Sequence, residues 1–183
     1  MNDEMLDHVE VPDENDPELD PAMIEVAFQK FEAEQSMSGG FLAGVAAALV
    51  GAGAWSLVTV LTGYQIGFMA IGVGFLVGLA VQFFGKGISK VFGVMGAALA
   101  LIGCLLGNYF TVVHFVGEAK GLGFFDTLTR IKPTAIPELM AMTFSPMDLV
   151  FYGIAVYEGY KLAFRKITHE EVQAAITGVP AGV

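Results

Sequence analysis

Four stretches of the chain are apolar enough and long enough to cross a lipid bilayer, and this feature most restricts the possible folds. They cover residues 41–62, 66–85, 91–116 and 147–164. A helix needs about 20 predominantly apolar residues to cross a hydrocarbon core of about 30 Å. The first three stretches contain no Asp, Glu, Lys or Arg, whereas the fourth is shorter and contains Glu158. The sequence therefore predicts an all-α membrane protein with four transmembrane helices.

The net charge of −10 belongs mainly to the first 40 residues. This part holds twelve Asp and Glu residues and one Lys, and the rest of the chain holds seven acids and eight Lys or Arg residues. Residues 1–20 are rich in acids and poor in large apolar side chains, which predicts a disordered tail. Because phosphate groups are bound by Lys and Arg, the composition argues against nucleic acid as a partner.

Residues 21–40 are predicted to form an amphipathic helix followed by a flexible hinge at Gly39-Gly40. Ile24, Phe28 and Phe31 recur at helical spacing, with acids elsewhere around the helix. Apolar anchors give a docked helix its affinity, and acidic residues attract a basic surface. We expect this helix and the acidic tail to bind a cytoplasmic protein through Ile24, Phe28 and Phe31.

The connections between the predicted spans set the topology. Residues 117–146 separate spans three and four, and their apolar pattern predicts two short helices at the membrane surface. Ser145, Pro146 and Asp148 form a typical helix start before the fourth span. An even number of spans places both termini on one side, which then carries six of the nine Lys and Arg residues. This excess predicts cytoplasmic termini, with residues 167–183 as a short cytoplasmic tail.

Small residues recur at helical spacing along the first three predicted spans. Inside lipid, small side chains let helix backbones approach closely enough for dispersion contacts, so these stripes predict tight helix packing. Because each span has small residues on more than one face, we also predict a homo-oligomer. The predicted packing residues are Gly44, Ala48, Gly51, Gly67, Gly74, Gly78, Gly85, Gly96, Ala100, Gly103 and Gly107.

Few polar side chains lie within or beside the predicted spans: Asn108, Thr111, His114, Glu158 and Lys161. A buried Asn usually hydrogen-bonds a neighbouring helix, and a His near the interface suits its amphipathic ring. A carboxylate inside the membrane is costly unless it is paired or protonated. Two interpretations remain open for Glu158: an ion pair with Lys161, or a place in a polar pathway or oligomer interface that includes all five residues.

No combination of residues typical of an enzyme, a metal site or a cofactor site stands out in the sequence. Cys104 is the one cysteine, which excludes a disulfide or a Cys-based zinc site within one chain. The glycines of residues 72–78 lie inside an apolar span and lack the strand–turn–helix setting of a dinucleotide-binding turn. We therefore expect no catalytic residues, metal or cofactor.

Two blocks of sequence resemble blocks in a group of small uncharacterised bacterial inner-membrane proteins. The first is TGYQIGFMAIGVGFLVG at residues 62–78, and the second is SPMDLVFYGIAVYEGYK at residues 145–161. The resemblance covers about residues 41–166. It implies a bacterial inner-membrane location and carries no activity with it.

Two classes of function follow from these patterns. The first is an integral membrane scaffold or interaction protein, a homo-oligomer whose acidic cytoplasmic tail docks a partner. The second is a small channel or transporter subunit with a polar path through Asn108, Thr111 and Glu158. A closed apolar centre along the axis of the oligomer favours the first class, and a hydrated polar centre there favours the second.

Overall fold

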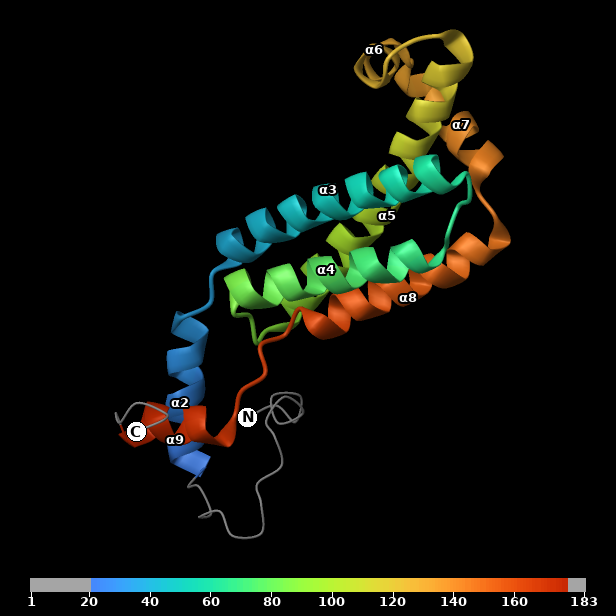
Figure 1. Ribbon diagram of the computed structural model, residues 1–183. Coiled ribbons are helices and arrows are strands. Elements are labelled where there is room, and N and C mark those ends of the chain that lie inside the picture. Colours follow the sequence, from blue (N-terminus) through green and yellow to red (C-terminus); the bar gives the residue numbers. More distant parts are fainter. Residues whose placement is uncertain (1–20, 178–183) are drawn as a thin grey trace.

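The computed structural model describes residues 21–177, in which all the regular elements are helices (Figure 1). The predicted disordered tail, residues 1–20, lies outside the described residues. Three helices are long and apolar enough to cross a membrane, which confirms the predicted all-α class and fits an integral membrane protein. These helices are α3 (Met37–Thr62), α4 (Phe68–Gly85) and α5 (Lys90–Lys120).

The fourth predicted span belongs to a bent pair of helices. The segment formed by η1 (Pro133–Ala135) and α7 (Ile136–Thr143) meets α8 (Pro146–Leu162) at an angle of 104°. The number of candidate spans rises from three to four if this bent pair is counted as one. The bend follows from Ser145, because the residue before a proline is disfavoured in helical conformation and here is extended.

Ser145 also caps α8, as its pattern predicts. Its side chain accepts a hydrogen bond from the backbone N–H of Met147, and its own N–H donates to Asp148 at 2.8 Å. The capping box satisfies backbone groups that the first turn of a helix leaves without partners. The predicted helix start is therefore confirmed.

The four long helices form a bundle with a mainly apolar core. Helix α3 packs against α4 and α5, and α8 packs against the same two helices. In Figure 1, α3, α4 and α8 run side by side, and α5 crosses them at an angle. Many core side chains are small or medium-sized, and Trp55 and Phe92 are the large exceptions that are equally buried. Small and medium core side chains that are at most 2% exposed include Val73, Val77, Ala100, Cys104 and Ala155.

Helix backbones meet at the small residues. A Cβ atom on Gly74 would lie 2.7 Å from Cα of Ala155, and one on Gly159 would lie 2.8 Å from the carbonyl oxygen of Gly96. Such contacts between backbones leave no room for a larger side chain. The sequence does not single out Gly159, which lies in the fourth segment. The other predicted packing positions also face neighbouring helices of the same chain: Gly44, Ala48, Gly51, Gly67, Gly78, Gly85, Ala100, Gly103 and Gly107.

The break between α2 (Pro21–Ala33) and the first span lies at residues 34–36, earlier in the chain than the predicted hinge. Helix α2 ends before these residues, and Ser36 then caps α3 by accepting a hydrogen bond from the N–H of Gly39 at 3.1 Å. Gly39 and Gly40 are part of α3. A Cβ atom on Gly40 would lie 3.0 Å from Cα of Gly85. These glycines therefore permit close packing against α4, and the predicted hinge at Gly39-Gly40 is corrected to the capped break before it.

The long segment between the third and fourth spans is helical. Helix α5 has 31 residues and is therefore about 46 Å long, which exceeds the hydrocarbon thickness of about 30 Å. Its far end extends beyond the ends of α3 and α4 and carries α6 (Phe124–Arg130) (Figure 1). Thr127 of α6 is buried against Gly117 of α5. Two short α-helices, α6 and α7, thus lie within residues 117–146.

Candidate functional site

The first candidate site is formed by helices from the two ends of the chain. Helix α9 (His169–Thr177) packs against α2 at one end of the bundle (Figure 1). Phe28 and Phe31 of α2 are 6% and 4% exposed, and they share a hydrophobic cluster with Ile167 and Val172. We call α2 and α9 together the terminal module. Residues 167–183 therefore contain a packed helix where the sequence predicts only a short tail.

The predicted docking residues are used inside the chain. Phe28 and Phe31 are covered by the C-terminal residues, and Ile24 packs against the same cluster. Ile24 stays partly exposed and Val26 of the same helix is 59% exposed, so α2 keeps some apolar surface outside this cluster. The helical spacing of these residues indicates an amphipathic helix, but spacing alone does not show which segment covers its apolar face.

Arg165 connects the parts of the terminal module. Its guanidinium donates to the carboxylates of Glu34 at 2.9 Å and Glu171 at 2.8 Å, and it lies over the ring of Phe31 at 5.1 Å from the centroid. The backbone N–H of Arg165 donates to the carbonyl oxygen of Gly87 at 2.8 Å. One residue therefore links α9, the end of α2 and the loop between α4 and α5.

Further hydrogen bonds fix the module to the end of the bundle. The N–H of Ser36 donates to the carbonyl oxygen of Gly85 at 2.8 Å. The side-chain amide of Gln82 donates to the carbonyl oxygen of Phe164 at 2.6 Å. These contacts join the start of α3 and the end of α8 to the end of α4, so the module has a fixed attachment.

Arg165 and its two carboxylate partners stabilise each other's charged forms, which is visible in the pKa values of Arg165 and Glu171. Burial acts to raise the pKa of Glu171, but hydrogen bonds from Arg165 and from the N–H of Thr168, together with the charge of Arg165, leave this pKa below its ordinary value. Burial acts to lower the pKa of Arg165, but the hydrogen bonds and charges of Glu171 and Glu34 leave it raised. The ion pairs therefore persist at neutral pH.

Acidification is expected to release α9 from α2. Because the pKa of Glu171 is lower in the folded chain, its stabilising contribution is complete above its unfolded pKa and is lost as pH falls through the folded pKa. We expect hydrogen exchange of the α9 amides, corrected for intrinsic rates, to accelerate on the acid side of the ordinary glutamate range. The Glu171→Gln variant should exchange faster at neutral pH and respond less to acid. Protection of α9 that does not change with pH would contradict this role.

A second group of polar side chains lies inside the other end of the bundle. Trp55 and Thr59 come from α3, Asn108 from α5 and Tyr152 from α8, and none is more than 5% exposed. The rings of Trp55 and Tyr152 meet edge to face with centroids 6.1 Å apart. The indole N–H of Trp55 and the hydroxyl of Thr59 have no hydrogen-bond partner in the described chain, and Tyr152 lies beside Asn108.

Hydrogen bonds connect this end of the bundle to the segments outside it. Oδ1 of Asn108 accepts from the hydroxyl of Thr143 at 3.3 Å, which ties α5 to the end of α7. The amide of Gln65 donates to Asp148 at 3.4 Å, which ties the α3–α4 turn to the start of α8. The contact of Asn108 is therefore with α7, and its predicted role in a polar pathway or an interface stays a prediction.

The other predicted pathway residues do not join Asn108 in one polar line. Thr111 is buried and donates to a carbonyl of its own helix at 2.9 Å, and His114 packs beside Phe115. Glu158 is partly exposed, and no ion pair joins it to Lys161 in the described chain. The amine of Lys161 instead lies 5.6 Å from the ring centroid of the neighbouring Tyr157.

The sequence does not single out the residues that organise these two regions. In the sequence, Arg165 is one of several basic residues beside a predicted span, and no sequence pattern indicates its contacts with Glu34 and Glu171. Trp55, Thr59 and Tyr152 lie in apolar runs without a motif. Among residues 21–177, no three His, Cys, Asp or Glu side chains are grouped as a metal site.

Comparisons of the chain with protein-family models, with curated proteins and with solved structures found no match. The fold and the contacts of the chain itself therefore supply the arguments about function.

Proposed function

We propose that the chain is an integral membrane scaffold that crosses the bilayer four times, with α8 as the fourth crossing. Helix α8 has 17 residues and is about 25 Å long, which is close to the hydrocarbon thickness of about 30 Å. It starts beside the α3–α4 turn, where Asp148 accepts from Gln65, and ends where the carbonyl of Phe164 accepts from Gln82. The two ends of α8 therefore lie beside the two ends of α4.

The terminal module carries the proposal of a scaffold. Arg165 holds α2 and α9 together against one end of the bundle, so that the two helices share one attachment to it. With four crossings, both helices lie on the same side of the membrane, and the excess of Lys and Arg on that side favours the cytoplasm. A bacterial inner membrane is the membrane that the two sequence blocks imply.

The proposed partner is a protein with a basic surface. Phe28 and Phe31 of α2 are covered, and the exposed acidic side chains of the module include Glu25, Glu32 and Glu170. Residues 1–20 add nine acids and no Lys or Arg. Complementary charges steer association and select the partner. This changes the expected docking contacts from apolar anchors to acidic side chains.

Deleting residues 1–20 is expected to remove the partner and to leave the terminal module intact. Proteins that co-purify with the full-length chain should be lost from the deletion variant, and rising salt should weaken their binding to the full-length chain. A variant of the same length with the nine acids replaced by Asn or Gln should behave like the deletion. An unchanged set of co-purifying proteins in both variants would contradict the proposal.

A homo-oligomer is also proposed. Gly53 and Gly153 face away from the chain's own bundle, since a Cβ atom on each would meet nothing within 4 Å. Small residues of this kind let a second copy approach closely. Light scattering of the detergent-solubilised protein should therefore give a multiple of the chain mass of 19.4 kDa, and a monomer mass would contradict it.

The alternative is a channel or transporter subunit. In the described chain Asn108 bonds to Thr143, Thr111 bonds to a carbonyl of its own helix, and neither bonds to Glu158. A single chain therefore does not join these three residues in one polar path, which favours the scaffold. Proton or ion flux into liposomes that depends on the protein and disappears in Glu158→Gln would reverse this preference.

A further inference from the structure

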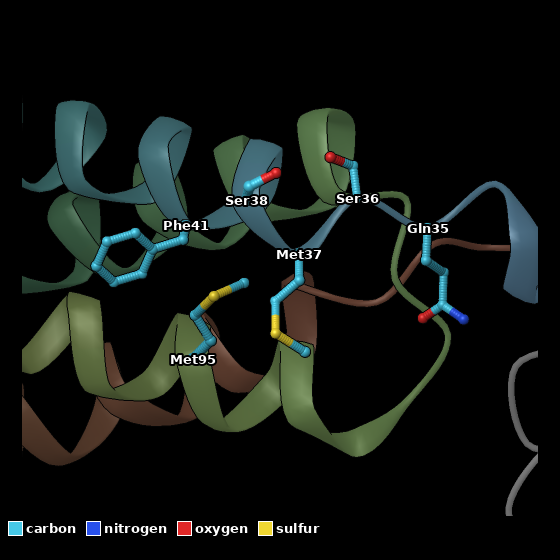
Figure 2. A pocket seen from close by; sticks show the side chains of 6 residues that line it. All are labelled: Gln35, Ser36, Met37, Ser38, Phe41 and Met95. Carbon is cyan, nitrogen blue, oxygen red and sulfur yellow. The ribbon is translucent and has the colours of Figure 1, made fainter.

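A groove of about 680 Å³ opens between the start of α3 and the first turns of α5 (Figure 2). Its volume lies in the range of about 300–1,000 Å³ that is typical of ligand pockets. The side chains that line it change from polar to apolar along its length. They are Gln35, Ser36, Met37, Ser38, Phe41 and Met95.

The order of these side chains matches the direction of a bilayer leaflet. Helix α3 begins at Met37, so its first turn lies at the membrane–water interface if α3 crosses the bilayer. Phe41 is four residues further along, which places it about 6 Å deeper. The polar end of the groove therefore lies at the level of lipid headgroups, and Phe41 and Met95 lie at the level of acyl chains (Figure 2).

We propose that this groove binds one phospholipid of the surrounding bilayer, with its headgroup beside Gln35 to Ser38 and an acyl chain along Phe41 and Met95. The inference rests on the membrane insertion of α3 in the proposed function, and it is independent of partner docking. Phe41 is 49% exposed, so an acyl chain has apolar surface to cover there. Unbranched Met side chains adapt readily to a flexible chain.

The polar end of the groove offers hydrogen-bonding groups to a headgroup. The hydroxyl of Ser38 makes no hydrogen bond in the described chain and is exposed, so it is free to bind a headgroup oxygen. The carbonyl oxygen of the Gln35 side chain already accepts from the N–H of Ile88 at 3.2 Å. None of the lining residues is charged, so the lining itself holds a headgroup by hydrogen bonds and not by an ion pair. Phosphatidylethanolamine, whose headgroup has both donors and acceptors, is the lipid used as the probe.

Photolabelling of the full-length protein in mild detergent tests the site. A trace of phosphatidylethanolamine with a photoactivatable acyl chain is added, and the labelled residues are identified by mass spectrometry. We expect the labelling yield at Phe41 and Met95 to be about tenfold higher than the yield at Leu57 and Leu61. A tenfold ratio corresponds to about 1.4 kcal/mol of additional binding free energy in the groove. The two leucines are exposed on the same helix outside the groove.

A pair of tryptophan variants separates the groove from the open surface of α3. Ser38→Trp fills the groove, and Leu42→Trp places the same ring on an exposed position of α3 that does not line it. We expect label on Phe41 to fall about tenfold in Ser38→Trp and to stay unchanged in Leu42→Trp. Equal labelling along α3 in the unmodified protein would overturn the proposal, even if Ser38→Trp fails to fold. Equal labelling of the two folded variants would also overturn it.

Discussion

Replacing Gly74 with alanine is expected to destabilise the bundle by about 3 kcal/mol, the upper part of the range for overpacking. The added Cβ atom would lie 2.7 Å from Cα of Ala155 and closer still to its carbonyl oxygen. These are backbone atoms of α8, so no side chain can rotate away and the whole helix must shift. For a chain of this size the melting temperature should fall by about 6–12 °C.

The matched control is Gly72→Ala, two residues earlier on the same helix. A Cβ atom at Gly72 would meet nothing within 4 Å. Alanine also favours the helix over glycine by about 1 kcal/mol, so the control should melt at the same temperature or slightly higher. Thermal unfolding in detergent, followed by circular dichroism, measures both variants. Equal changes at Gly72 and Gly74 would contradict the close contact between α4 and α8.

Replacing Arg165 with alanine is expected to free α9 from α2 while the bundle itself stays folded. The substitution removes two ion pairs, each worth less than about 1 kcal/mol because the carboxylates are partly exposed, and a cation–π contact of about 0.5–1 kcal/mol. A total of about 2 kcal/mol corresponds to about 30-fold faster hydrogen exchange in α9. The amides of α4 should keep their protection.

Arg130→Ala is the control for this substitution. Arg130 is an exposed arginine at the end of α6, and no ion pair joins it to another residue in the described chain. Its removal should leave the exchange of α9 unchanged. Slow exchange of α9 in Arg165→Ala, equal to that in Arg130→Ala, would show that the apolar cluster alone holds the module.

The parts of the fold that depend on local chemistry could be predicted from the sequence. The apolar runs place α3, α4, α5 and α8 within a few residues of their actual ends, because run length and polar flanks decide where a helix crosses lipid. The start of α8 follows from Ser145 and Pro146. The glycines that separate close helices also follow from their spacing, but Gly39-Gly40, predicted as a hinge, instead belongs to the packed start of α3.

The parts that depend on distant contacts could not be predicted in this way. Arg165 and Glu34 are 131 residues apart in the sequence, and nothing near either residue indicates the other. Helix α9 is short and mostly polar, so its pairing with α2 depends on a few apolar side chains such as Val172. The buried polar side chains around Asn108 come from three helices, and only the packing of these helices brings them together. They are Trp55, Thr59, Asn108 and Tyr152.

If the chain crosses the bilayer four times, both of its ends return to the same side of the membrane. Cysteine labelling with a membrane-impermeant maleimide measures this, using Glu25→Cys, Glu170→Cys and Lys132→Cys in a Cys104→Ala background. All three positions are exposed. On sealed vesicles of known orientation, we expect residues 25 and 170 to be labelled from the cytoplasmic side and residue 132 from the opposite side. Labelling of residues 25 and 170 from opposite sides, as three crossings would produce, would contradict it.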